Sequence, residues 1–116
     1  MDEILQTEEV TRELNSHRNM PETEPISKTT GCTANVVLIT ASHYIIANAG
    51  DSRSSLCRGG KAIDLSLDHK PESSEEENRI KNAGGTIYMG RVNGGLNLTR
   101  SFGDFDYKAR KDLGYH

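Results

Sequence analysis

Two apolar runs rich in β-branched residues dominate the first half of the chain. Residues 34–40 read ANVVLIT and residues 43–50 read HYIIANAG, with only Ala41-Ser42 between them. β-branched side chains suit the pleated strand, and two such runs joined by a short turn predict an antiparallel pair. The first run is apolar enough to suit a buried strand.

A second antiparallel pair is predicted immediately downstream. Short strands are expected at 54–58 and 61–65, and Gly59-Gly60 separates them. Two glycines can both adopt positive φ, which a two-residue type I′ hairpin turn requires. The pattern therefore predicts a tight hairpin at this point.

A charged helix is predicted after Pro71. Ser73 and Ser74 each have a glutamate three residues later, so either serine can open the helix with a capping box. Acidic residues come first and basic residues follow, which suits the helix dipole, and Gly84-Gly85 is expected to end the helix. The stretch beyond it is expected to form short strands broken by glycines.

The N-terminal part has a different character. Residues 1–17 show a loosely helical spacing of apolar side chains, with no N-cap ahead of it, and 18–30 contain two prolines and read as a loop. Residues 1–30 hold seven acidic and three basic side chains, a net charge of −4, so an acidic, solvated segment is expected ahead of a nearly neutral body.

Length and composition exclude several classes of protein. A chain of 116 residues suits one domain, and a pI near 5.8 argues against a nucleic-acid binder. No apolar run approaches the roughly 20 residues that span a membrane, and no signal-peptide pattern follows Met1. Cys32 and Cys57 lack zinc-site spacing and are expected to be reduced, partly buried thiols. A monomer in the cytoplasm or nucleus is the expectation.

Few residues have the spacing that common catalytic motifs require. No phosphate-binding glycine loop, HExxH or GxSxG is present. Asp51 directly follows an apolar strand, and a carboxylate there suits a hard cation such as Mg²⁺ or Mn²⁺. The alternative is an Asx turn in which Arg53 pairs with Asp51 on the surface.

Two further clusters leave alternatives open. Arg100 can hold a phosphate with two hydrogen bonds, or it can be a structural ion-pair partner. His69, beside Lys70, can shuttle a proton, or the segment is simply a turn before the helix.

Taken in order, these clusters resemble the middle of a known family. The series is GCTA (31–34), NAGDSR (48–53), DHKP (68–71), E..RI..AGG (76–85), RVNG.L.LTR.FGD (91–104) and YK (107–108). It is similar to the type 2C family of metal-dependent serine/threonine protein phosphatases. The N-terminal segment also resembles the family helix that precedes GCTA, so the resemblance covers nearly the whole chain.

The resemblance implies an α+β fold, with the chain as an internal fragment of a four-layer α-β-β-α sandwich of mainly antiparallel sheets. It divides the partial catalytic domain into a helix (1–17), an acidic loop (18–30), strands (31–67), a flap-like region (68–100), and a return strand and tail (101–116).

The resemblance also implies a chemistry. Family members hydrolyse phosphoserine and phosphothreonine in proteins with two Mg²⁺ or Mn²⁺ ions and a metal-bridging water. Of the acidic site residues only Asp51 carries over, as a residue linked to metal. The flap-like region is implied to border the substrate, with His69, Lys70, Arg91 and Arg100 as its candidate residues.

The sequence departs from the family at the metal centre. The ED pair and the DGH, DG.WD and DN motifs that supply most metal ligands are absent. The chain alone is therefore expected to be inactive, since one carboxylate cannot hold two divalent cations. The alternatives are a non-catalytic binding or regulatory module derived from a phosphatase domain, and a partial product with no independent role.

Overall fold

A computed structural model describes residues 1–17, 29–109 and 112 of the chain. Two compact units are present, one made of Met1–Cys32 with Phe102–Gly114 and the other of Thr33–Ser101. The predicted acidic loop at 18–30 lies almost wholly outside the described residues. Helices and antiparallel strand pairs both occur, so the predicted α+β class is confirmed.

The first unit contains segments from the N-terminal and C-terminal parts of the chain, which meet in a short strand pair. Its elements are α1 (Asp2–Leu5), α2 (Glu8–Ser16), β1 (Gly31–Cys32), β8 (Phe102–Gly103) and the 3₁₀ helix η1 (Phe105–Tyr107). Strand β1 pairs with β8, with Gly31 opposite Gly103. Asp2 ties α1 to this region, because one carboxylate oxygen accepts from the Gly103 amide and the other pairs with Lys108 Nζ at 2.5 Å.

The N-terminal helix is split in two. A single loosely helical segment was the expectation, but α1 stops at Leu5 and α2 begins at Glu8. Thr7 provides the cap that the sequence pattern did not reveal, since its hydroxyl accepts from the Val10 amide.

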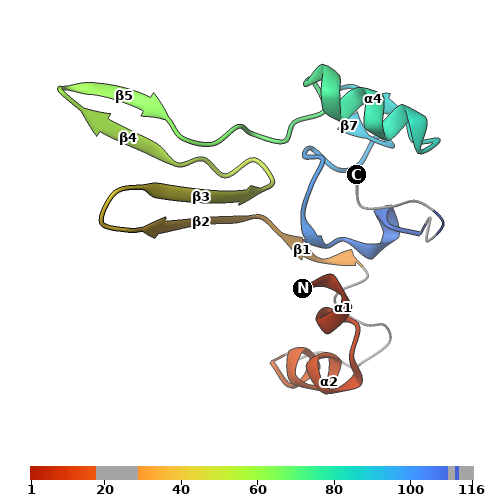
Figure 1. The fold of residues 1–116 in the computed structure, drawn as a ribbon. Coiled ribbons are helices and arrows are strands. Elements are labelled where there is room, and N and C mark those ends of the chain that lie inside the picture. The colour runs from red at the N-terminus through yellow and green to blue at the C-terminus, as the bar shows by residue number, and fades with distance from the viewer. Residues whose placement is uncertain (18–28, 110–111, 113–116) are drawn as a thin grey trace. The chain divides into compact units, whose positions relative to one another are not determined.

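The second unit contains the two predicted hairpins and the charged helix (Figure 1). Its elements are β2 (Ala34–Ile39), β3 (Tyr44–Ala49), β4 (Ser55–Arg58), β5 (Lys61–Asp64), α4 (Ser74–Asn82), β6 (Ile87–Tyr88) and β7 (Arg91–Val92). Strand β2 pairs with β3 and β4 pairs with β5, each antiparallel and close to the predicted bounds.

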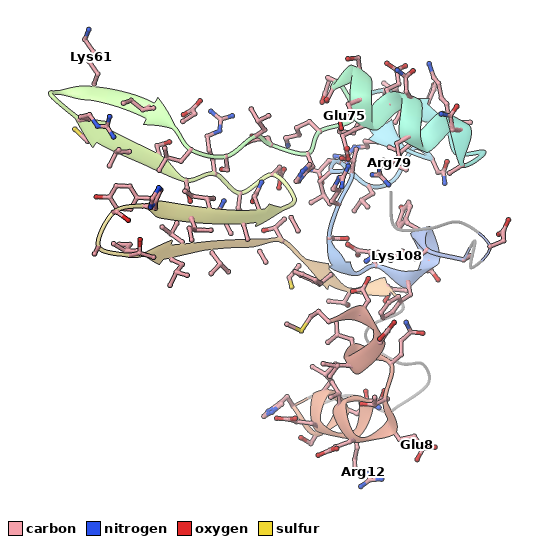
Figure 2. All side chains as sticks on the ribbon, in the orientation of Figure 1. Glu8, Arg12, Lys61, Glu75, Arg79 and Lys108 are labelled. Atoms are coloured by element: carbon pink, nitrogen blue, oxygen red, sulfur yellow. The ribbon has the colours of Figure 1, made fainter. Side chains whose placement is uncertain are left out.

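The tip of the β4–β5 hairpin has the predicted geometry. Gly59 and Gly60 have φ values of 58° and 74°, so both lie in the left-handed region that a type I′ turn needs. Lys61, which opens β5, points outward from this tip (Figure 2). The β4–β5 pairing is thus fixed by local chain geometry.

Helix α4 begins and ends near the predicted residues but is capped differently at its start. Ser73 is the N-cap residue without a side-chain cap bond, so the predicted capping box is wrong. At the other end the Gly85 amide donates to Ile80 and the Gly84 amide to Lys81, which is the Schellman pattern.

Much of the apolar surface of the β2–β3 hairpin is exposed, whereas a buried strand was predicted. Leu38 is 58% exposed, and its neighbour Ile39, on the opposite face, is 69% exposed. Among the described residues, Ile80, Val92 and Pro71 are the large apolar side chains that are buried. The described residues therefore place no covering layer on either face of this hairpin.

The two cysteines differ from the sequence prediction in their exposure. Cys32 and Cys57 are both free thiols, but both are exposed, whereas partly buried thiols were predicted. None of the described helices has the length and apolar character needed to cross a bilayer.

The exposed hairpin predicts self-association of the chain. Replacing Leu38 with Lys should reduce aggregation, because a charge on an exposed apolar strand disfavours contact between molecules. Light scattering and the fluorescence of a hydrophobic dye should both decrease relative to the unmodified chain.

Ala62→Lys is the matched control, since it adds the same charge to an exposed position of the β4–β5 hairpin. Equal decreases in the two variants would show that the added charge matters and that the β2–β3 surface does not.

Candidate functional site

Gly50 forms the sharp turn that follows β3. Its φ is 111°, and a Cβ atom at this position would lie 2.3 Å from Thr33 Cγ2 and 3.1 Å from the Arg100 carbonyl oxygen. A larger residue is therefore excluded both by backbone conformation and by space. This constraint sets the direction in which the next residue, Asp51, leaves the strand.

His69 is held against this turn by two hydrogen bonds. Its amide donates to the Gly50 carbonyl at 2.9 Å, and its Nδ1 accepts from the Gly50 amide at 3.1 Å. The Thr99 amide donates to the His69 carbonyl at 3.0 Å. Three segments far apart in sequence thus meet at His69.

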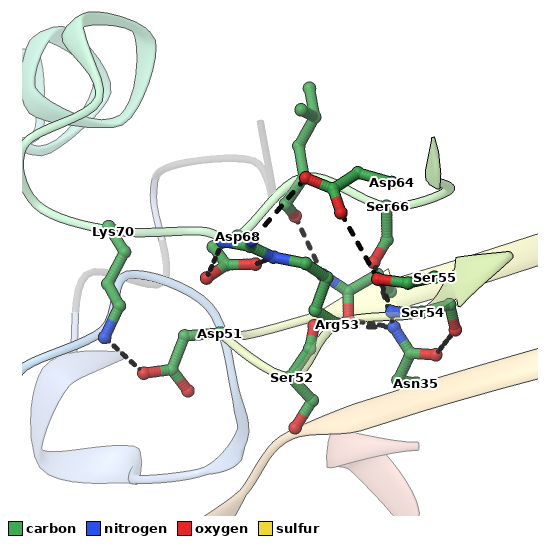
Figure 3. A network of polar contacts seen from close by, with 12 residues as sticks. Asn35, Asp51, Ser52, Arg53, Ser54, Ser55, Asp64, Ser66, Asp68 and Lys70 are labelled. Carbon is green, nitrogen blue, oxygen red and sulfur yellow. Dashed lines mark hydrogen bonds and ion pairs between the residues drawn. The ribbon is translucent and has the colours of Figure 1, made fainter. Parts of the chain in front are cut away.

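Asp51 pairs with Lys70, the residue after His69 (Figure 3). Lys70 Nζ lies 2.5 Å from Asp51 Oδ2, and the two side chains are 39% and 23% exposed. The hydrogen bond to Asp51 raises the pKa of Lys70. The structure therefore brings together three of the residues singled out from the sequence, Asp51, His69 and Lys70.

Arg53 has other partners than the sequence suggested. Its Nε and Nη2 donate to the two carboxylate oxygens of Asp68 at 2.9 and 3.0 Å, and Nη1 lies 3.5 Å from Asp64. The alternative in which Arg53 pairs with Asp51 is therefore wrong. Asp51 pairs with the Lys70 ammonium instead.

A polar network beside Asp51 was not predicted at all (Figure 3). Asn35 Nδ2 donates to Asn48 Oδ1 at 2.9 Å and to Ser66 Oγ at 3.3 Å, and Ser54 Oγ donates to Asn35 Oδ1. Asn35 lies opposite Asn48 in the β2–β3 pair. Each asparagine interrupts an otherwise apolar strand. These two polar residues were the feature of the sequence from which the network could have been predicted.

Glu76 is the most deeply buried charged residue of the described chain and lies at the centre of a second cluster. We call Glu76, Arg79, Thr99 and Arg100 the Glu76 cluster. Arg100 Nη2 donates to Glu76 Oε1 at 2.6 Å, Arg79 Nη2 to Oε2 at 3.0 Å, and the Thr99 hydroxyl to Oε2 at 2.6 Å. The sequence suggested a capping role for this glutamate, but its carboxylate turns inward instead.

The contacts in the Glu76 cluster set the ionisation of the glutamate. Burial raises the pKa of Glu76, but hydrogen bonds from Arg100, Thr99 and Arg79 outweigh burial and lower it to about 2. Glu76 is therefore ionised at neutral pH and neutralised by two guanidinium groups.

The two candidate arginines occupy different settings. Arg100 directs its Nε and Nη2 at Glu76, which matches the structural ion-pair alternative. Arg91 is exposed, and its Nη1 donates to the Gly95 carbonyl within the same glycine-rich segment. Met89 and Gly90, in the turn before Arg91, both have positive φ, and the Met89 side chain is 82% exposed.

The described residues do not fit a binuclear metal centre. No group of three or more His, Cys, Asp or Glu side chains comes together anywhere in the part of the chain that the structure describes. Asp51 offers one carboxylate, and its Oδ2 is already paired with an ammonium group. Two divalent cations need several oxygen ligands each, so these residues do not complete such a site.

Comparison with known proteins places these motifs in a family. A family profile described as Protein phosphatase 2C matches residues 2–113. "Probable protein phosphatase 2C 3" of Paramecium tetraurelia is 50% identical over 113 residues, which cover 97% of this chain and 37% of that protein. "Protein phosphatase ppm-1.G" of Caenorhabditis elegans is 62% identical over 84 residues, or 72% of this chain and 17% of that protein. The chain thus spans little more than a third of the length of the Paramecium relative and about a sixth of the length of the Caenorhabditis relative.

The Gly50 turn predicts an unusually large effect of one methyl group. Gly50→Ala is expected to lower the free energy of unfolding by about 3 kcal/mol or more, because positive φ and the clash with Thr33 add together. Gly59→Ala is the control, since Gly59 also has positive φ but open space around it. It should cost only about 1–2 kcal/mol in denaturant titrations. Equal costs would refute the role of the clash.

The buried Glu76 predicts a particular pH dependence of stability. Because its folded pKa is lowered, ionised Glu76 stabilises the fold above its ordinary pKa of 4.5, and this contribution is lost as the pH falls toward 2. Glu76→Gln should lower the thermal unfolding midpoint at neutral pH and flatten its decrease between these two values. Glu77→Gln, on the same helix turn, should keep the slope of the unmodified chain. An equally steep slope in Glu76→Gln would contradict the assignment.

Proposed function

Because the chain belongs to the protein phosphatase 2C family, we propose that it is part of a Mg²⁺- or Mn²⁺-dependent phosphatase acting on phosphoserine and phosphothreonine in proteins. The observation that carries the proposal is the Gly50-Asp51 turn, in which Asp51 and Lys70 face each other beside His69. A carboxylate at the end of a strand is the kind of ligand that these hard cations prefer.

We propose Asp51 as the residue of this chain that is directed toward metal. Its carboxylate is held by a glycine turn with little freedom and by the Lys70 ammonium, so its position is well defined. Lys70 Nζ is paired with Asp51 Oδ2, which leaves Oδ1 outside this ion pair. Any cation at Asp51 therefore has to displace the ammonium or use the other oxygen.

The region 68–100 is proposed to border the substrate. Arg91 and Met89, which are both exposed, form the part of this region that we propose to meet a phosphoprotein. Arg100 contributes through structure, because its guanidinium is engaged by Glu76. His69 and Lys70 connect the region to Asp51.

The chain by itself is proposed to be catalytically inactive. The described residues supply one metal-directed carboxylate, which is too few oxygen ligands for a binuclear centre. In an assay with a phosphothreonine peptide and millimolar Mn²⁺, the purified 116-residue chain should release no phosphate above the metal-only background. Metal-dependent turnover that disappears in Asp51→Asn would overturn this part of the proposal.

A non-catalytic binding module is the second candidate, and the exposed turn at Met89 favours it. Peptide binding can be measured on the same samples by fluorescence anisotropy. Binding that is weakened by Arg91→Ala and unaffected by Asp51→Ala would favour the module. Arg58→Ala is the matched control, because Arg58 is an exposed arginine next to the turn of another hairpin.

A further inference from the structure

A series of hydrogen bonds leads from the buried Glu76 to the Asp51 turn. The Thr99 hydroxyl donates to Glu76 Oε2 at 2.6 Å, and Arg79 Nη2 donates to the Thr99 carbonyl at 2.7 Å. The Thr99 amide in turn donates to the His69 carbonyl at 3.0 Å. Thr99 is therefore held at its hydroxyl, its carbonyl and its amide.

The series continues from His69 to the residue before Asp51. His69 exchanges two hydrogen bonds with Gly50, one through its amide and one through its ring. Asp51 and Lys70 are the next residues along these two segments, and they form the 2.5 Å ion pair. Each step from Glu76 to this pair is thus a direct hydrogen bond or a peptide link.

Anchoring helix α4 alone does not account for the position of Glu76. Its partners Thr99 and Arg100 are 23 and 24 residues away in sequence, and the Glu76 side chain is only 4% exposed. Glu77, on the same helix turn, pairs within the helix with Lys81 and needs no distant partner. The buried carboxylate therefore fixes the 99–100 segment as well as the helix.

We propose that Glu76 is a positioning residue for the Asp51–Lys70 pair, acting through Thr99 and His69. The functional meaning of that pair rests on the proposed phosphatase function, but the coupling itself is a property of the chain alone. Loss of the Glu76 charge weakens its guanidinium bonds and releases Thr99, because hydrogen bonds to an ionised group are the stronger ones. His69 then loses its support on the side away from Gly50.

Amide hydrogen exchange measured by NMR on the 116-residue chain tests this coupling. In Glu76→Gln, the amides of Thr99, His69 and Gly50 should exchange about tenfold faster or more. The Thr40 amide, which donates to His43 in the β2–β3 turn, should keep its rate. Glu77→Gln should leave all four rates unchanged.

A second variant keeps the proposal testable if Glu76→Gln fails to fold. Thr99→Val removes only the hydroxyl contact, and it should accelerate exchange at His69 and Gly50 in the same direction by a smaller factor. Faster exchange confined to α4 and Thr99, with His69 and Gly50 unchanged, would overturn the proposal. The exchange experiment uses neither metal nor substrate. Its result is therefore independent of the result of the phosphatase assay.

Discussion

A buried, ionised carboxylate needs nearby positive charges and hydrogen-bond donors. In the second unit of this chain, Glu76 is such a carboxylate, and its partners supply both. Two guanidinium groups and a hydroxyl surround its oxygens, and they come from helix α4 and from the 99–100 segment. Breaking such a buried pair by removing one partner is costly, because the remaining charge is left uncompensated. With few buried apolar side chains in the described residues, this polar cluster is a main tertiary link of the region 68–100.

The β2–β3 hairpin exposes apolar side chains on both of its faces in the part of the chain that the structure describes. Its strands carry apolar residues on both faces, as strands that are covered on both sides do. The chain spans 37% of the length of a Paramecium relative that matches it almost throughout. A hairpin of this kind gains most of its stability from the surfaces that cover it, since an isolated pair of strands is only marginally stable in water.

Sequence reasoning succeeded where the determinants are local. The Gly59-Gly60 turn and the Gly84-Gly85 helix end depend on backbone conformations that a few adjacent residues decide. It failed at Glu76. A glutamate three residues after a serine predicts a capping box, but the same spacing also allows a carboxylate that faces inward. The outcome depends on Arg100, which is distant in sequence. It failed again at Arg53, where nearness in sequence suggested Asp51 while the fold brought Asp68 closer. The sequence singled out Asp51 and Lys70 separately, and the ion pair between them is seen only in the structure.

The two exposed cysteines have a practical consequence. Cys32 belongs to one compact unit and Cys57 to the other, and each thiol is free and accessible. These are the only cysteines of the chain, so the unmodified sequence already carries one attachment point per unit. A pair of spin labels or fluorophores coupled to them would report the separation of the two units, and its change when a partner binds, without any substitution.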